Sequence, residues 1–156
     1  MSNHVTSVLF VCMGNICRSP AAECFFRLAV KSAGVSQKYS MDSAGTGGWH
    51  VGAKPDRRMR AAAKKRGLEI TGSARQITVS DFSTFDLIIC MDRDNLDEVL
   101  SMGAIPEKTK LLLPFVSHVS VEEVPDPYYG GEEGFDTVIT LIYDAAHALV
   151  DVMESR

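Results

Sequence analysis

The stretch VLFVCMGNICRSPAAE, residues 8–23, decides the fold, because an apolar strand runs directly into a cysteine and a helix follows. Residues 5–11 are apolar or β-branched with no polar face, which is typical of a strand buried on both sides of a parallel sheet. Ser19, at or near the N-cap, and Pro20 in the first turn then predict a helix that stops at Gly34. The loop between strand and helix carries Cys12 and Arg18 with five residues between them.

Short apolar runs alternate with helical stretches along the rest of the chain. Further strands are predicted at residues 38–44, 85–91 and 110–115, the last bent or ended by Pro114. Helices are predicted at 55–66, from an Asp92 cap to about 102, and at 135–154. This pattern predicts a single α/β domain over residues 1–156, with a four-stranded parallel sheet flanked by helices on both faces. The loop between the first strand and first helix then lies at the carboxyl edge of the sheet, where ligands bind.

The composition argues against nucleic-acid and membrane partners. The 156 residues carry a net charge of −4, and the longest basic run, Lys64-Lys65-Arg66, is interpreted as a solvated helix end. The first residues lack the features of a secretory signal, and no apolar stretch approaches membrane-spanning length. We therefore expect a cytoplasmic protein that is a monomer.

The cysteines and histidines are not spaced for a metal site. No CxxC pair occurs and the four histidines are scattered, so we expect no metal and no cofactor. In a reducing cytosol the thiols should be free, and Cys24 and Cys90 fit helix and strand packing.

The loop CMGNICRS has the residues that an anion site above a sulfur nucleophile needs. A loop around a tetrahedral oxyanion turns its N–H groups inward, and Gly14 allows close approach while Asn15 tolerates a positive φ. Arg18 can offer two parallel N–H bonds to phosphate oxygens, and Ser19 can donate to the Cys12 sulfur. A thiol beside a helix N-terminus and an arginine ionises readily, so we expect a thiolate. The alternative is a buried cysteine beside a surface arginine.

Together, these motifs resemble the low-molecular-weight protein tyrosine phosphatase family. The strand–CMGNICRSP–helix unit resembles its phosphate loop, and further motifs follow in the family's order and spacing: DSAGT at 42–46, PDRRM at 55–59, FDLIICMD at 85–92 and DPYYGG at 126–131. The resemblance covers nearly the whole chain. It implies hydrolysis of phosphotyrosine in proteins, and of small aryl phosphates, without metal or cofactor.

The resemblance also implies roles for individual residues. Cys12 is the expected nucleophile, forming a phosphocysteine, and Arg18 the group that holds the equatorial oxygens. Asp126 is the expected general acid and then base, although an Asp-Pro pair is also common in turns. Asn15 and Ser43 are expected to fix the loop's shape, with a turn role for Ser43 as the alternative. The phosphate-binding loop comprises Met13, Gly14, Asn15, Ile16, Cys17 and Ser19.

The resemblance further implies an aromatic cleft suited to a phenyl phosphate. The residues expected to line it are Met13, Ile16, Trp49, Tyr128 and Tyr129. The two tyrosines have an alternative role, packing their own loop. Under peroxide, a sulfenic acid at Cys12 could close onto Cys17 as a disulfide, although Cys17 could equally be a small apolar filler.

Three other functions fit parts of the pattern. An arsenate reductase shares the loop but relays a disulfide through further cysteines, and the only thiol beyond the first predicted helix is Cys90 in a predicted buried strand. A phosphoarginine phosphatase resembles CTGNTCRS, with Thr where this chain has Ile16. A non-catalytic phosphate-binding module predicts loss of Cys12, Arg18 or Asp126, and all three are present.

Overall fold

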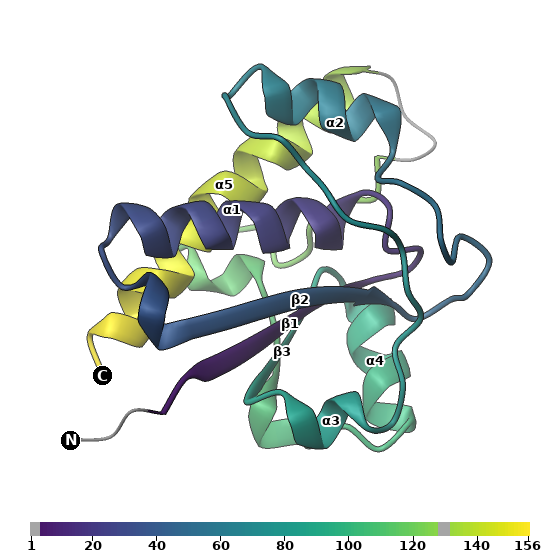
Figure 1. The fold of residues 1–156 in the computed structure, drawn as a ribbon, viewed down its shortest axis with the longest axis vertical. Coiled ribbons are helices and arrows are strands. Elements are labelled where there is room, and N and C mark those ends of the chain that lie inside the picture. Colours follow the sequence, from purple (N-terminus) through teal and green to yellow (C-terminus); the bar gives the residue numbers. More distant parts are fainter. Residues whose placement is uncertain (1–3, 128–131) are drawn as a thin grey trace.

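The computed structural model describes residues 4–127 and 132–156, without the side chains of Glu132 and Glu133. Its centre is the predicted four-stranded parallel sheet with helices on both faces (Figure 1). The strands are β1 (Thr6–Cys12), β2 (Tyr39–Gly45), β3 (Leu87–Cys90) and β4 (Thr109–Leu111). Their order across the sheet is β2-β1-β3-β4, so β1 lies in the interior of the sheet.

The register brings the carboxyl ends of three strands together. Cys12, the last residue of β1, pairs with Gly45 at the end of β2, and Val11 pairs with Cys90 at the end of β3. All of these pairings are parallel. The loop that follows Cys12 therefore lies between the ends of β2 and β3.

Two helical layers cover the sheet. Helices α1 (Arg18–Ser32), α2 (Arg57–Lys64) and α5 (Glu132–Glu154) lie above it in Figure 1, and α3 (Asp81–Thr84) and α4 (Arg93–Ser101) below it. Three short 3₁₀ turns join these elements: η1 (Ser36–Lys38), η2 (Pro106–Lys108) and η3 (Leu113–Phe115). None of the described helices combines the length and apolarity needed to cross a membrane.

The alternation of side chains along β1 divides the core in two. Val8 and Phe10 belong to the apolar cluster under α1 and α5, whereas Leu9 and Val11 belong to the cluster on the opposite face. This period of two explains why no residue between 8 and 11 is polar, since both faces are buried. Cys12 continues the first set and therefore faces the side of the sheet that carries α1.

Some predicted boundaries are wrong. Ser19 lies near the N-cap of α1, as predicted, but Cys17 takes the cap position itself, without a side-chain cap, while the Ser19 hydroxyl lies against the Cys12 sulfur. The fourth strand ends at Leu111, and the rest of the predicted strand forms η3, in which Pro114 lacks the N–H a strand requires.

The helix predicted over 55–66 is shorter than expected, and α5 is longer. Helix α2 begins at Arg57 because the Asp56 carboxylate caps it, accepting from the amides of Arg58 and Met59 at 2.8 and 3.3 Å. Helix α5 begins at Glu132, before the predicted start at Phe135. The Asp92 cap of α4 is confirmed, with a full capping box to Asn95.

Candidate active site

A small cavity opens above the end of β1, where residues 13–17 connect the strand to α1. Cys12 lies at its base and is only 2% exposed. The backbone N–H of Asn15 points at this sulfur, and Asn15 has a φ of 57°, the left-handed conformation predicted for it. The cavity is lined by Cys12, Met13, Gly14, Ile16, Cys17, Arg18, Trp49, His50 and Asp126.

The Cys12 sulfur accepts hydrogen bonds from two directions. The Ser19 hydroxyl lies 2.9 Å from it and the backbone N–H of Asn15 donates to it at 3.3 Å. The Asn15 amide orientation is fixed because its Oδ1 accepts the backbone N–H of Arg75 at 2.9 Å, and a backbone N–H can only donate. Its Nδ2 therefore donates to Ser19 Oγ at 2.8 Å, and the single Ser19 hydrogen goes to the sulfur at 2.9 Å, which is nearer than its other acceptor, the Ala44 carbonyl at 3.5 Å.

The same amide anchors the loop to β2 and α1. Asn15 Nδ2 also donates to Ser43 Oγ at 3.0 Å, as predicted for this pair. Ser43 in turn donates to Glu23 at 2.8 Å, and Arg27 donates to the other Glu23 oxygen at 2.7 Å. Each of the side chains in this series of hydrogen bonds has a partner, which holds the loop in one shape.

Arg75 fixes the far side of the loop through its side chain as well as its backbone. Its guanidinium bonds Asp81 through two nitrogens, at 3.0 and 3.2 Å, and Asp42 at 3.1 Å. Burial lowers the pKa of Arg75, but the hydrogen bonds and charges of Asp81 and Asp42 outweigh it and raise that pKa. The segment that supplies the Asn15 partner is thus clamped between β2 and α3.

Arg18 is the first residue of α1 and is buried, with 3% of its side chain exposed. It donates to Asp92 at 2.5 Å and to the Val124 carbonyl at 3.0 Å, both through one nitrogen. Burial lowers the pKa of Arg18, but the charges of Cys12 and Asp92, with the Asp92 hydrogen bond, raise it. The guanidinium therefore stays charged in the same cavity as the sulfur.

Asp126 reaches this cavity from the segment between η3 and α5. Its carboxylate accepts from the second Arg18 nitrogen at 3.5 Å, and 29% of its side chain is exposed. The Val124 N–H donates to the Met91 carbonyl at 2.8 Å, which ties this segment to the end of β3. A carboxyl group, a guanidinium and a sulfur thus line one cavity, as the sequence predicts.

The other thiols are buried. Burial, followed by the charges of Asp56 and Cys12, raises the pKa of Cys17, so this thiol is protonated at neutral pH. Burial also raises the pKa of Cys24 and of Cys90. Both belong to the apolar clusters of the core, which confirms their predicted packing role.

Three of the residues predicted for the substrate cleft line this cavity. Met13 and Ile16 line it, and Trp49 stands at its rim with 66% of its surface exposed. Tyr128 and Tyr129, also predicted for this cleft, lie outside the described residues.

Sequence reasoning missed three residues of the site. The ring of His50 covers Gly14 so closely that a Cβ there would lie 2.8 Å from the His50 Cδ2, and only its position beside Trp49 hints at this. Asp92 was expected only as a helix cap, although it follows a buried strand whose carboxyl end meets that of β1. No sequence pattern around Arg75 indicates that it belongs to the site.

Among the described residues, no cluster of three or more histidine, cysteine or carboxylate side chains is arranged to bind a metal ion. The cavity instead offers hydrogen-bond donors and a fixed positive charge around a sulfur. Such an arrangement binds a tetrahedral oxyanion and presents a nucleophile to it.

Comparison with known proteins agrees with this geometry. The family model described as "Low molecular weight phosphotyrosine protein phosphatase" matches residues 7–156. A low molecular weight phosphotyrosine protein phosphatase of Schizosaccharomyces pombe is 44% identical over 143 residues, covering 86% of this chain and 89% of the relative. A crystal structure of a protein tyrosine phosphatase from Entamoeba histolytica, with Hepes in its active site, superposes with a TM-score of 0.91 at 42% identity, covering 96% and 97% of the two chains. A Drosophila arginine phosphatase superposes with a TM-score of 0.87 at 34% identity, covering 94% and 97%.

Proposed function

Given that the chain belongs to the low molecular weight phosphotyrosine protein phosphatase family and is a cysteine-dependent protein-tyrosine phosphatase, we propose that Cys12, Arg18 and Asp126 carry out its reaction. The observation that carries this assignment is their presence in one cavity, with the Ser19 hydrogen directed at the sulfur. The reaction has two steps joined by a phosphocysteine.

In the first step the thiolate of Cys12 attacks the phosphorus of the substrate in line with the phenolic oxygen. The S–P bond forms as the P–O bond to the phenol breaks, and Asp126 gives its proton to the departing oxygen. Arg18 and the loop amides hold the three equatorial oxygens while their charge is redistributed. The configuration at phosphorus inverts.

In the second step water attacks the phosphocysteine from the side that the phenol has left. The carboxylate of Asp126 accepts the proton of that water, the S–P bond breaks, and inorganic phosphate is formed. The electron pair returns to sulfur, so Cys12 leaves as a thiolate and receives the Ser19 hydrogen bond. This bond is therefore most useful when the sulfur is the leaving group.

The depth of the sulfur supports phosphotyrosine as the substrate. Cys12 is 2% exposed below a rim that includes Trp49, so a phosphoryl group on a long aryl side chain reaches it and one on serine does not. Phosphotyrosine-containing proteins are thus the expected partners. We further propose that the enzyme works as a monomer in the cytoplasm, where reducing conditions keep a nucleophilic thiol free.

Phosphoarginine is the second candidate substrate, because the arginine phosphatase of Drosophila shares the fold at 34% identity. The presence of Ile16, where phosphoarginine-specific relatives are expected to have Thr, favours the aryl substrate. Arsenate reduction is less well supported, since the downstream thiol Cys90 is fully buried within β3.

A side-by-side assay of phosphotyrosine, phosphoserine, phosphoarginine and arsenate in EDTA tests this function. We expect turnover of phosphotyrosine and small aryl phosphates only, unaffected by the chelator. Cys12→Ser should abolish turnover yet retain a bound anion, because Arg18 and the loop amides are intact. Faster turnover of phosphoarginine, or an active Cys12→Ser variant, would refute the assignment.

A further inference from the structure

A second hollow, distinct from the cavity over Cys12, lies beside α2. It has a volume of about 840 Å³ and runs between this helix and the segment 67–72 that follows it. We call it the α2 groove; it is lined by Lys54, Pro55, Arg60, Lys64, Gly67, Leu68, Glu69, Ile70, Thr71 and Gly72. None of these residues lines the catalytic cavity.

The α2 groove is positively charged although the chain is acidic overall. Three cations, Lys54, Arg60 and Lys64, face a single carboxylate in its lining, Glu69, whereas the net charge of the chain is −4. Among the side chains that the structure describes, which exclude those of Glu132 and Glu133, no carboxylate lies within ion-pair distance of these three; Arg60 donates instead to the Pro55 carbonyl at 3.0 Å.

The basic residues directly after α2 are used within the protein. Lys65 pairs with Asp136 of α5 at 3.4 Å, and Arg66 donates to Thr140 of the same helix at 2.8 Å. The run Lys64-Lys65-Arg66, predicted as a solvated helix end, therefore divides. Two of its members bind α5 and Lys64 faces the groove.

The two cations that α2 contributes to the groove repel each other. Arg60 and Lys64 are four residues apart and share one face of α2, where like charges repel. An anionic ligand in the groove would offset this repulsion.

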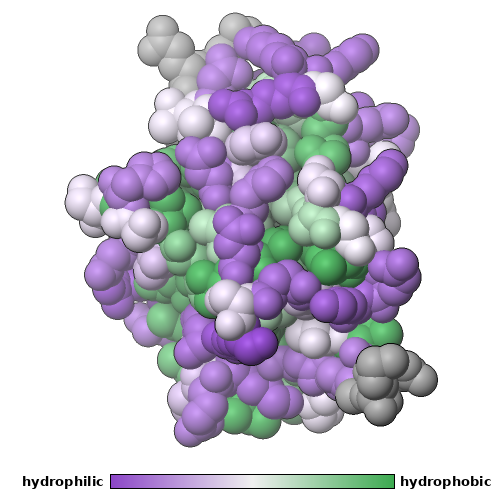
Figure 2. Space-filling model, turned by 90° about the vertical axis from the view of Figure 1, so that its left-hand side faces the viewer, coloured by the Kyte–Doolittle hydropathy of each residue, from purple (hydrophilic) through white to green (hydrophobic). Residues whose placement is uncertain are grey.

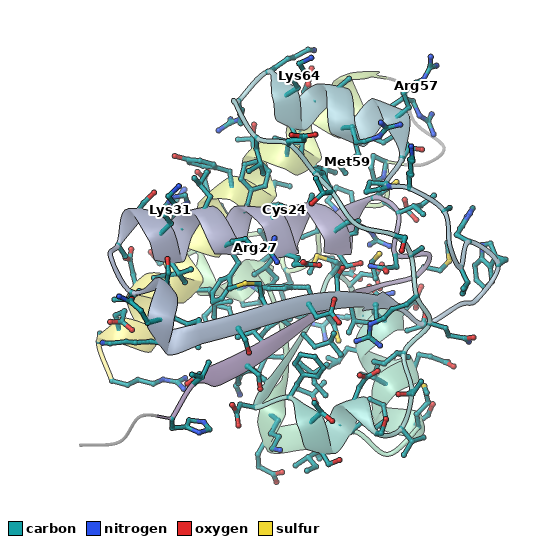
Figure 3. All side chains as sticks on the ribbon, viewed as in Figure 1. Cys24, Arg27, Lys31, Arg57, Met59 and Lys64 are labelled. Atoms are coloured by element: carbon teal, nitrogen blue, oxygen red, sulfur yellow. The ribbon has the colours of Figure 1, made fainter. Side chains whose placement is uncertain are left out.

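The near end of the groove is tied to the catalytic loop. The Asp56 N–H donates to the Ile16 carbonyl at 2.7 Å, and Asp56 caps α2. Arg57 and Lys64 lie at opposite ends of this helix (Figure 3), so the groove leads away from the active site. Eight helical residues span roughly 12 Å, the length of three or four residues of extended peptide.

We propose that the α2 groove binds acidic residues flanking the phosphotyrosine of a protein substrate, and that this enzyme therefore favours acid-flanked sites. The proposal rests on the proposed function, since it needs the phosphotyrosine held over Cys12. A peptide suits this site because the groove is concave and includes Leu68 and the buried Ile70 beside its cations. Figure 2 shows hydrophilic side chains over much of this face of the molecule, including its top, the level of α2 in Figure 1.

The test compares kcat/KM within two pairs of phosphotyrosine peptides. In the first pair, either four glutamates or four glutamines precede the phosphotyrosine. In the second pair, the four glutamates or four glutamines follow it. We expect one glutamate peptide to be favoured about five- to tenfold, the effect of three exposed ion pairs. This preference should fall in high salt. The variant Lys54→Gln/Arg60→Gln/Lys64→Gln should lose it while hydrolysing para-nitrophenyl phosphate and the glutamine peptides at the wild-type rate.

A matched control removes the same charge elsewhere, in Lys31→Gln/Lys108→Gln/Lys110→Gln, and should keep the preference. No preference in the wild type, a preference that survives in the groove variant, or equal loss in the control would overturn the proposal. The proposal would also be overturned if the groove variant lost only its binding to phosphatidylserine vesicles, because the groove would then be a lipid site. Failure of the wild type to hydrolyse para-nitrophenyl phosphate would instead refute the proposed function.

Discussion

The Ser19→Ala substitution should slow the second chemical step more than the first. Ser19 Oγ accepts a hydrogen from Asn15 at 2.8 Å, and its own hydrogen goes to the Cys12 sulfur at 2.9 Å, which is nearer than the Ala44 carbonyl at 3.5 Å. In the first step this bond stabilises the attacking thiolate, which is a reactant. In the second it stabilises the departing thiolate, and thus the transition state.

The size of the effect follows from the charge on the acceptor. A hydrogen bond to a charged group contributes roughly 1.5–3 kcal/mol, which corresponds to a decrease in kcat of about 10- to 150-fold. The phosphocysteine should then accumulate, because its formation is slowed less than its hydrolysis. Rapid mixing with para-nitrophenyl phosphate should show a burst of nitrophenolate equal to the enzyme concentration, followed by slow turnover.

A matched control is Ser43→Ala, which removes a hydroxyl that is linked to Ser19 only through the Asn15 amide and does not contact the sulfur. It should lower kcat less and give no burst, since Asn15 still donates to Ser19. Turnover of Ser19→Ala at the wild-type rate, or slow turnover without a burst, would show that the hydroxyl does not stabilise the leaving sulfur.

Four further outcomes follow from the site and the core. Asp126→Ala should slow phenyl phosphate by about 10²- to 10⁴-fold and para-nitrophenyl phosphate much less, because a poor leaving group needs the proton; equal slowing removes the acid role. Asp92→Asn should still cap α4 yet lower the urea-unfolding free energy by about 1–3 kcal/mol, since Arg18 loses its charged partner; unchanged unfolding contradicts this. Peroxide should inactivate the enzyme reversibly, and Cys17→Ser should recover less fully with thiol; equal recovery excludes a protective disulfide. Burial raises the pKa of Cys90 above the ordinary 9.0, so the free energy of unfolding keeps the full contribution of the protonated thiol below pH 9 and decreases as the pH rises beyond it. In Cys90→Ala, the free energy from urea unfolding should decrease less steeply with pH, and the same pH dependence in both proteins would refute this.

Local chemistry made most of the elements predictable. Asp92 caps α4 as expected, and Gly34 ends α1 with a φ of 73°, the left-handed conformation that glycine adopts easily. Helix α3 was missed because four residues, Asp81–Thr84, are too short to show a helical period. The fourth strand was drawn too long because an apolar run fits a strand and a 3₁₀ turn equally well, as η3 shows.

The candidate site was predictable where its residues are neighbours in sequence. Cys12, Asn15, Arg18 and Ser19 lie within one loop and one helical turn, so residue types and spacing sufficed. Asp126 came from the resemblance to a family, because an Asp-Pro pair has no distinguishing local pattern.

The residues that were missed depend on the order of the strands, which an apolar pattern cannot specify when both faces of every strand are buried. Because β3 lies beside β1, the second residue beyond its end is Asp92, and its carboxylate meets Arg18 at 2.5 Å. If β4 lay beside β1 instead, the second residue beyond the end of that strand would be Leu113, which cannot pair with a guanidinium. The buried cation of the catalytic cavity would then lack its nearest carboxylate, so the charge that holds the substrate depends on sheet topology as well as on the loop motif.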